Sequence, residues 1–545
     1  MQSVLKKPPF RFLCLTYLCA VLVGALAVWL AKSYQSGFSG ADEPSHFLNG
    51  YFVADYLAHH FGGNPMRAAA DFYIHYPKIS IGHWPPGYYG VLGLLFLVLP
   101  PTLPVIFAVN VMFSALPALG VAAALSMLAG RRAALAGALV YALAPLVLEG
   151  HVMFMADQPL TACLVAATGV WVAFSVRPGW DKALAFALLA ALAVLIKGNG
   201  WLVVFIPVFH ILLTANWKLL LSVRLYVAAA LAAAIVVPWY MLTAKIAADG
   251  FNYQAGLPYA TKALLFNLRA LGQNLTPVGG LLALYAIMAE FRARQSDPVR
   301  WTIVSAVISL LLATLLLQSL VPVDIVERYM APALPAVVVL AVLGALRLLA
   351  RLRADSPASA PALAALAVIM AVPGMMHLAR RAPKADMGVA AVTDRLAAGQ
   401  PGLTVIDGSA SAEGCFIADM AVHDRGLHGF VVRASRLLAD SNFMGTTYSL
   451  KYRDTADVLA ALHRLGVQHV VLVREGDQAA YPHSAQIRVA LARGDSGFRL
   501  TQRVPHQYRS GVTEVYDAIR PTRLDVAAIR NMGLPAKAMT LTRLQ

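Results

Sequence analysis

Eleven apolar runs divide the first 380 residues of this chain, and most of them are long enough to cross a lipid bilayer as a helix. A spanning helix needs about 20 apolar residues, because a helix rises about 1.5 Å per residue across a hydrocarbon core about 30 Å thick. The runs predict a polytopic α-helical membrane protein. They lie near residues 12–32, 104–129, 133–150, 157–175, 183–196, 200–214, 222–243, 270–291, 301–320, 330–350 and 360–378.

Composition agrees with a membrane location. Hydrophobic residues make up 59% of the sequence and charged residues 13%, and the mean hydropathy is +0.65, which excludes an ordinary soluble protein. The formal charge of +16 comes from Lys and Arg residues scattered between apolar runs, a pattern that favours a lipid bilayer and not nucleic acid as the partner. Four cysteines without C-x-x-C spacing predict neither a disulfide framework nor a cysteine metal site.

Basic residues between the runs predict the orientation of the chain. With the N-terminus in the cytoplasm and an uncleaved first helix, five basic clusters between the runs all fall on the cytoplasmic side, as the positive-inside rule requires. The segment 87–99 is apolar but only about 13 residues long, so we expect it to be re-entrant or steeply packed, giving eleven to thirteen spans. The basic clusters are Arg131-Arg132, Arg177 with Lys182, Lys218 with Arg224, Arg292 with Arg294 and Arg300, and Arg351 with Arg353.

This topology places four polar segments on the outer face: residues 33–86, 151–157, 197–200 and 321–329. The segment 244–269 joins them, and its residues Tyr253, Tyr259, Lys262 and Arg269 predict a lid or part of a substrate groove. The outer face is therefore where we expect a functional site in the cytoplasmic (inner) membrane.

The acidic pair Asp42-Glu43 follows the first span and is the first candidate for chemistry. At the rim of a cavity, low dielectric and mutual repulsion can raise the pKa of one carboxyl toward that of a general base, and the pair could also hold a divalent metal ion. The plainer interpretation is a solvated acidic turn that ends a helix, with Pro44 as the breaker. The pair alone does not separate these alternatives.

An aromatic and proline-rich run, from His83-Trp84 to Tyr88-Tyr89, leads into the short apolar segment. Rings held by prolines can stack on the face of a sugar. For each ring singly, an aromatic belt at the membrane interface is the favoured explanation.

Three further outer segments carry charge, and each has an ordinary explanation. Asp157 stands where a span begins and suits a helix N-cap, Lys197 could snorkel from a helix end, and Arg328 could form an interfacial pair with Glu327. Their predicted coincidence with Asp42 on one membrane face favours a shared site of carboxylates and cations. Such a site suits transfer of a group from a lipid phosphate, because cations stabilise the leaving phosphate while a carboxylate accepts a proton.

Beyond about residue 385 the composition becomes that of a soluble domain. Short β-branched runs at 403–406, 430–432 and 469–473 alternate with amphipathic stretches such as 456–465. We predict a transmembrane domain over residues 1–380 and a small α/β extracytoplasmic domain over residues 386–545.

Over about residues 10–350 the chain resembles the membrane-embedded GT-C type glycosyltransferases, specifically the protein O-mannosyltransferases and the aminoarabinose transferases that modify lipid A. The motifs that carry the resemblance are Asp42-Glu43, His83-Trp84-Pro85-Pro86-Gly87-Tyr88-Tyr89, Met155-Ala156-Asp157-Gln158-Pro159, Lys197-Gly198 and Glu327-Arg328-Tyr329-Met330-Ala331-Pro332-Ala333-Leu334-Pro335.

The resemblance implies an inverting glycosyltransferase that takes a sugar from a polyprenyl phosphate and passes it to a lipid, glycan or protein hydroxyl. It implies Asp42 as the base, Glu43 as its helper or a metal ligand, and Asp157 as a second acidic residue. Family members differ in whether they need a metal. Substrate contacts are expected from His46, Lys78, His83, Trp84, Tyr88, Lys197, Arg328 and Tyr329.

The chain departs from the aminoarabinose transferases in its first outer segment. Those enzymes carry an Arg close behind the acidic pair and a Lys before the double proline, where this chain has Ser45-His46 and Trp84. Lys78, His46 or His83 could replace the missing phosphate contacts. The alternative functions are a transporter or flippase of a lipid-linked sugar and a membrane-anchored scaffold; a transporter would need no base, and the chain lacks the repeats typical of one.

Overall fold

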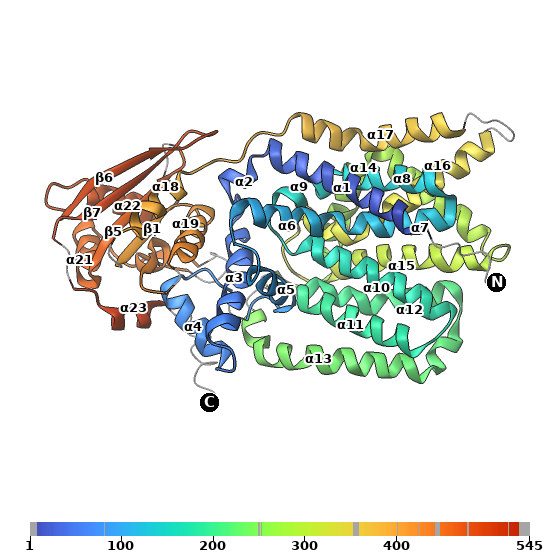
Figure 1. Cartoon of the computed structure of the whole chain (residues 1–545), viewed down its shortest axis with the longest axis horizontal. Helices are drawn as coiled ribbons and strands as arrows, with labels where there is room; N and C mark the ends of the chain where they lie inside the picture. Colours follow the sequence, from blue (N-terminus) through green and yellow to red (C-terminus); the bar gives the residue numbers. More distant parts are fainter. Residues whose placement is uncertain are drawn as a thin grey trace.

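A computed structural model describes residues 8–80, 82–248, 251, 253–352, 359–399, 402–424, 426–441, 447–476, 479–520 and 523–533. A bundle of long helices forms one part of the elongated molecule, and a smaller domain that contains a β-sheet lies at one end of it (Figure 1). Helices α3, α4 and α5 lie between the two parts.

The bundle contains helix at each of the eleven predicted apolar runs. Among the described residues, eight helices are long and apolar enough to cross a membrane, or nine if α8 and α9, bent by 59° where Pro145 begins α9, form one broken span. The other two runs fall on α11, of 17 residues, and on the shorter apolar stretch Gly198–Thr214.

The helices of the bundle are α1 (Phe10–Leu30), α6 (Leu103–Ala115), α7 (Pro117–Ala129), α8 (Arg131–Ala142), α9 (Pro145–Val152), α10 (Asp157–Val176), α11 (Trp180–Ile196), η1 (Gly198–Val204), α12 (Phe205–Thr214), η2 (Trp217–Leu221), α13 (Val223–Ala247), α14 (Leu257–Arg292), α15 (Pro298–Leu320), η4 (Glu327–Ala333), α16 (Leu334–Leu352) and α17 (Ser359–Ala379).

Apolar side chains cover the outside of the bundle as well as its core. On α1, Leu15, Leu22 and Trp29 are all more than half exposed. On α14, Leu281 is exposed in the same way. A surface of this kind is stable in lipid and not in water, so it agrees with a multi-pass membrane protein.

The segment between α1 and α6 is mostly helical: α2 (Ser33–Ser36), α3 (Glu43–His59), α4 (Pro65–His75) and α5 (Gly87–Phe96). The interpretation of Pro44 as a helix breaker is wrong, because Pro44 lies in the first turn of α3. Proline is tolerated there since that N–H has no partner within the helix. Helix α5 has 10 residues, so it covers about 15 Å, half of a bilayer core.

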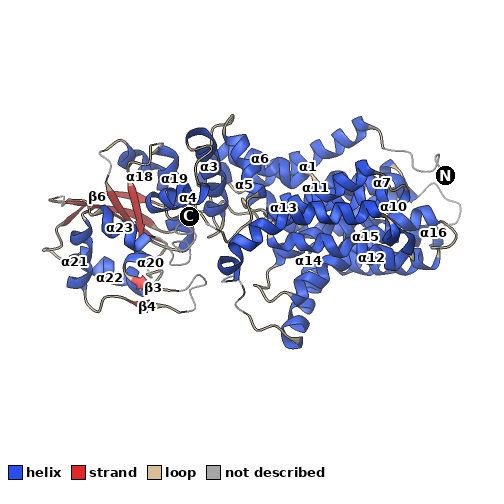
Figure 2. Ribbon diagram, turned by 90° about the horizontal axis from the view of Figure 1, so that it is seen from below, coloured by secondary structure: helices blue, strands red, loops and turns tan. Residues whose placement is uncertain are grey.

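The C-terminal domain is built around a five-stranded sheet in the order β2-β1-β5-β7-β6. Strand β1 pairs in parallel with β2 and β5, whereas β7 is antiparallel to both β5 and β6. Helices lie on both sides of this sheet (Figure 2). The predicted α/β character is confirmed. The β6-β7 hairpin was not predicted, because β6 exposes polar side chains along most of its length.

The elements of this domain are α18 (Val389–Ala397), β1 (Leu403–Asp407), α19 (Ala410–His423), β2 (Phe430–Arg433), α20 (Ala434–Leu437), β3 (Ala439–Asp440), β4 (Ser449–Leu450), α21 (Thr455–Leu465), β5 (Val467–Arg474), α22 (Pro482–Leu491), β6 (Phe498–Pro505), β7 (Val512–Ala518) and α23 (Val526–Gly533).

Candidate active site

Asp42 stands at the start of α3 with its carboxylate directed toward the bundle. It is the N-cap residue of α3, yet its side chain makes no capping hydrogen bond. Instead its Oδ2 accepts a hydrogen bond of 3.0 Å from Nη2 of Arg328, which lies 286 residues away on η4. The helix start therefore directs a carboxylate at a cation of the bundle instead of at its own backbone.

Glu43 points elsewhere, although it adjoins Asp42 in the sequence. Its buried carboxylate accepts hydrogen bonds from the backbone N–H groups of Ser39, Gly40 and Phe154, at 2.7 to 2.8 Å. Nζ of Lys384 lies 3.4 Å from its Oε2. These donors occupy both carboxylate oxygens, so the geometry favours a structural role for Glu43 over that of a helper to Asp42.

A second ion pair joins Asp157 and Lys197. Nζ of Lys197 donates to Oδ1 of Asp157 at 2.7 Å, and both side chains are nearly buried. The expected N-cap role of Asp157 is wrong, because Ala156 is the N-cap and Asp157 is the first residue of α10. Its Oδ2 is buried with no hydrogen-bond partner within the described structure, so an acceptor remains available in the site.

The ring of Tyr329 connects the two ion pairs. Nζ of Lys197 lies 4.7 Å from its centroid, and Cζ of the neighbouring Arg328 lies 5.7 Å away. Both distances are within the range of cation–π attraction. Residues from four distant segments, Asp42, Asp157, Lys197 and Arg328, thus form one cluster, which we call the ion-pair cluster.

The charges of the ion-pair cluster decide the protonation of Asp42. Burial alone would raise the pKa of this carboxyl, but its electrostatic interactions with His46, Arg328 and Lys197, together with the hydrogen bond from Arg328, outweigh burial and lower its pKa. The prediction of a raised pKa was wrong because Glu43, the expected repelling neighbour, is turned away. Asp42 is therefore ionised at neutral pH, as a proton acceptor must be.

His46 borders this cluster but is not a cation. Its ring stacks on Trp84 at 4.2 Å, and its Nδ1 shares a hydrogen bond of 2.7 Å with the hydroxyl of Tyr89. Burial lowers the pKa of His46 to about 3, against opposing attraction from Asp42. A neutral imidazole cannot replace the basic residue that the aminoarabinose transferases have near this place.

The low pKa of His46 predicts a loss of stability in acid. In the unfolded chain this histidine takes up a proton below pH about 6.5, whereas in the folded protein it does so only near pH 3. The unfolded state then binds more protons between these values, so stability falls as the pH falls, by about 2 kcal/mol at pH 5. In thermal unfolding measurements, His46→Gln should lose less stability than wild type between pH 7 and pH 5. Equal losses in the two proteins would contradict the assignment.

Three other residues were predicted to contact the substrate: Lys78, Tyr88 and His83. Lys78 donates to the backbone oxygen of Ala410 in the C-terminal domain at 3.3 Å. Burial, reinforced by Arg433, lowers the pKa of Lys78 to about 8. Tyr88 is 2% exposed, so it has no ring face to offer a sugar, and it packs as a core residue. His83 is half-buried.

The segment expected to form a lid is mostly helical, since α13 ends at Ala247 and α14 begins at Leu257. Its two tyrosines nevertheless contact the segment before Arg328. The hydroxyl of Tyr253 donates to Asp324 at 2.8 Å, and that of Tyr259 donates to the backbone oxygen of Val323 at 2.7 Å.

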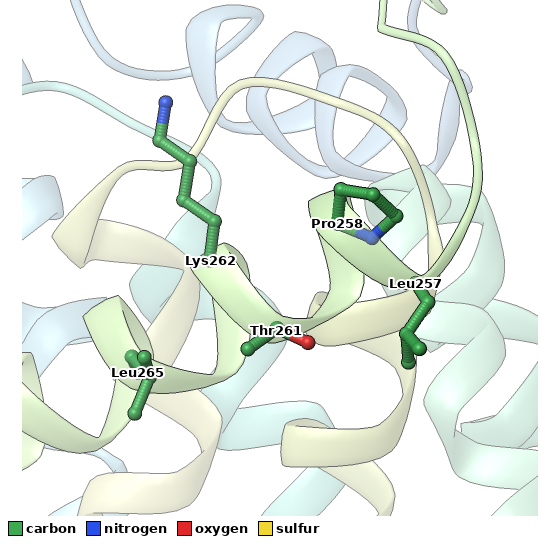
Figure 3. A pocket seen from close by; sticks show the side chains of 5 residues that line it. All are labelled: Leu257, Pro258, Thr261, Lys262 and Leu265. Atoms are coloured by element: carbon green, nitrogen blue, oxygen red, sulfur yellow. The ribbon is translucent and has the colours of Figure 1, made fainter.

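The start of α14 also borders a shallow hollow of about 600 Å³, shown in Figure 3. The hollow is lined by Leu257, Pro258, Thr261, Lys262 and Leu265.

The site gives no support for a metal held by Asp42 and Glu43. Among the described residues, no group of three or more His, Cys, Asp or Glu side chains is arranged to hold a metal ion. The oxygens of Glu43 face N–H donors and an ammonium group, which a cation would have to displace. We therefore assign no step to a metal.

Comparisons with known proteins agree with this architecture. The family model described as dolichyl-phosphate-mannose-protein mannosyltransferase matches residues 83–242. No curated protein sequence matches the chain at a significant level. Among solved structures, ArnT from Cupriavidus metallidurans bound to undecaprenyl phosphate superposes with a TM-score of 0.55 at 13% identity, covering 93% of this chain and 98% of that one.

The same ArnT in the apo state gives a TM-score of 0.53 at 14% identity, over 91% of this chain and 97% of that one. At these identities the likeness establishes the fold. The expected resemblance is confirmed: this chain has the fold of the membrane-embedded GT-C type glycosyltransferases, with a sheet-containing C-terminal domain.

Proposed function

We propose that this protein is a glycosyltransferase that moves one sugar from a polyprenyl phosphate to a hydroxyl group on a lipid, glycan or protein acceptor. The observation that carries the proposal is the ion-pair cluster, in which an ionised carboxylate lies beside two cations. The matched family and the ArnT structure support the donor class, since that family uses dolichyl-phosphate-mannose and that structure holds undecaprenyl phosphate, both of them polyprenyl phosphates.

Asp42 is the proposed base. As the acceptor oxygen attacks the anomeric carbon, Asp42 accepts the hydroxyl proton, and the bond from that carbon to the phosphate oxygen breaks. One displacement from the face opposite the leaving group inverts the anomeric configuration. The products are the glycosylated acceptor and a free polyprenyl phosphate.

Arg328 and Lys197 are the proposed phosphate contacts. Negative charge accumulates on the phosphate as its bond to the sugar breaks, and fixed cations stabilise that charge without reorganisation. Arg328 uses one nitrogen for Asp42, while its buried Nε has no partner in the described structure. A guanidinium has five N–H donors in a planar fork, so Arg328 can bind both Asp42 and the phosphate.

Asp157 has two proposed tasks. Its Oδ1 holds Lys197 in place, and its unpartnered Oδ2 can accept a hydrogen bond from a hydroxyl or amino group of the donor sugar. Trp84 stacks one face of its ring on His46, and its other face is the proposed contact for the donor sugar.

We place the reaction at the outer face of the cytoplasmic membrane. The distribution of Lys and Arg supports this orientation, because the clusters between spans fall on the opposite side from the ion-pair cluster. The C-terminal domain then lies outside with the site.

Reconstitution tests the proposed activity. Purified protein in proteoliposomes is given a polyprenyl phosphate with a radiolabelled sugar and an extract of envelope lipids and glycans as acceptor. We expect label to leave the polyprenyl carrier and appear in an acceptor, with opposite anomeric configuration by NMR. A transporter would instead move the intact labelled lipid between leaflets, and that result would reject the proposal.

A further inference from the structure

The C-terminal domain and the linker before it contact the loop that carries Asp42, defined here as residues 37–44. Lys384 lies in the linker between α17 and α18, and it is almost completely buried. Its backbone N–H donates to the oxygen of Ala31 at 2.8 Å, which fixes the linker to the end of α1. The linker is thus attached to the helix end that lies shortly before the loop in the sequence.

The side chain of Lys384 enters the same loop. Its Nζ donates to the backbone oxygen of Gly37 at 3.0 Å and lies 3.4 Å from the carboxylate of Glu43. The ammonium also lies 4.9 Å from the ring centroid of Phe107. Glu43 is the residue next to Asp42, so one buried cation holds both ends of the loop.

Helix α19 of the C-terminal domain contacts the loop from a second direction. The thiol of Cys415 donates to the backbone oxygen of Phe38 at 3.3 Å. A Cβ atom on Gly414 would lie 2.9 Å from Cγ of Pro44 and 2.7 Å from Cε of Lys78. Only glycine permits this approach, because the proline ring cannot move away as a flexible side chain could.

A third set of contacts continues this interface past α4. The hydroxyl of Tyr76 donates to the carboxylate of Asp424 at 2.5 Å. His75 stacks on Phe430 with centroids 4.2 Å apart and is hydrogen-bonded to the backbone oxygen of Gly429. The interface is therefore specific and polar as well as apolar, which is typical of a fixed contact between domains.

We infer that the C-terminal domain and its linker set the position of Asp42, and that Lys384 and Gly414 are positioning residues for the proposed transfer. The inference rests on the proposed function. Lys384 binds the loop through Glu43, and Gly414 supports it through Pro44, so the two residues flank Asp42 without touching the ion-pair cluster. A displacement of about 1 Å in a catalytic group can lower a rate about 100-fold.

Lys384→Met tests the linker contact, with Lys451→Met as control. Lys451 forms an exposed pair with Asp440 in the same domain. We expect Lys384→Met to lower kcat by about 10- to 100-fold while the Kd for undecaprenyl phosphate stays within about twofold, because Lys197 and Arg328 are intact.

If Lys384→Met fails to fold, the double variant Glu43→Gln/Lys384→Met removes the unpaired buried charge and should fold with the same loss of kcat. Wild-type kcat in a folded variant would overturn the inference.

Gly414→Ala tests the helix contact, with Gly494→Ala as control. Alanine favours a helix more than glycine does, so a loss in Gly414→Ala reflects the close contacts with Pro44 and Lys78. A Cβ on Gly494 would meet no atom within 4 Å. We expect kcat to fall only for Gly414→Ala, with an unchanged Kd for undecaprenyl phosphate. Equal kcat in the two variants would overturn the inference.

A separate readout applies if the wild-type protein transfers no sugar, a result that rejects the proposed function. Trypsin can cleave the linker after Arg380 and Arg381. We then expect faster cleavage there in Lys384→Met than in wild type or Lys451→Met, since the linker has lost its anchor. Unchanged cleavage would overturn the positioning role as well.

Discussion

Replacing Asp42 by Asn should lower the rate constant of sugar transfer by about 1,000-fold, within the range typical of removing a general base. The amide cannot accept the proton of the attacking hydroxyl at neutral pH. It remains similar in size and can still accept a hydrogen bond from Arg328. Single-turnover transfer from a radiolabelled polyprenyl-phosphate sugar measures the chemical step directly.

Asp55→Asn is the matched control for this change. Asp55 lies on the same helix α3 and pairs with His59, away from the ion-pair cluster. The control should keep the wild-type rate, and Asp42→Asn should keep the wild-type Kd for undecaprenyl phosphate. Full turnover by Asp42→Asn would exclude Asp42 as the base.

Removing either cation should weaken binding of the donor phosphate. A hydrogen bond to a charged group contributes about 1.5–3 kcal/mol, so Arg328→Met should raise the Kd for undecaprenyl phosphate by about 10- to 150-fold. Lys197→Met should have the larger effect, because it also leaves the carboxylate of Asp157 buried without its partner. Titration of the purified variants with undecaprenyl phosphate gives both values.

Three further measurements distinguish a loss of phosphate binding from a general loss of folding stability. Lys182→Met removes the cation of an exposed pair at the other end of α11 and should bind like wild type. Asp157→Asn/Lys197→Met should recover thermal stability relative to Lys197→Met, but not affinity. In Arg328→Met the pKa of Asp42 should rise, because a neighbouring positive charge is gone, so the acid limit of transfer should move to higher pH. Wild-type affinity in both single variants would contradict the phosphate assignment.

The sequence was sufficient to predict the membrane helices and the composition of the ion-pair cluster. Lipid cannot satisfy backbone polar groups, so each spanning helix must appear as an apolar run. The basic residues between runs then indicate which polar segments share a face. For that reason Asp42 and Asp157 could be grouped with Lys197 and Arg328 before any contact was known.

The details that the sequence did not predict depend on partners distant in the chain. The carboxylate of Glu43 is turned away from Asp42 by the N–H of Phe154 and the ammonium of Lys384, 111 and 341 residues away. Tyr88 is a core residue because the surrounding helices bury it. No local pattern distinguishes these outcomes from the catalytic and sugar-binding roles that were expected.

The interface with the C-terminal domain could not be predicted from the sequence either. A lone lysine in a linker and a glycine within a helix have no distinctive sequence signal, and their contacts with the Asp42 loop arise only when the two domains are packed together. Residues 33–86 were placed on the outer face from the sequence, but the helices α2, α3 and α4 that the structure shows there were not predicted.

A cryo-electron microscopy structure of Asp42→Asn with a bound polyprenyl-phosphate sugar tests the central claim most directly. We predict that the phosphate lies within hydrogen-bond distance of Lys197 and Arg328, with the anomeric carbon facing the side chain at position 42. A phosphate bound elsewhere, with Lys197 and Arg328 still paired only to carboxylates, would contradict the assignment of the ion-pair cluster as the active site.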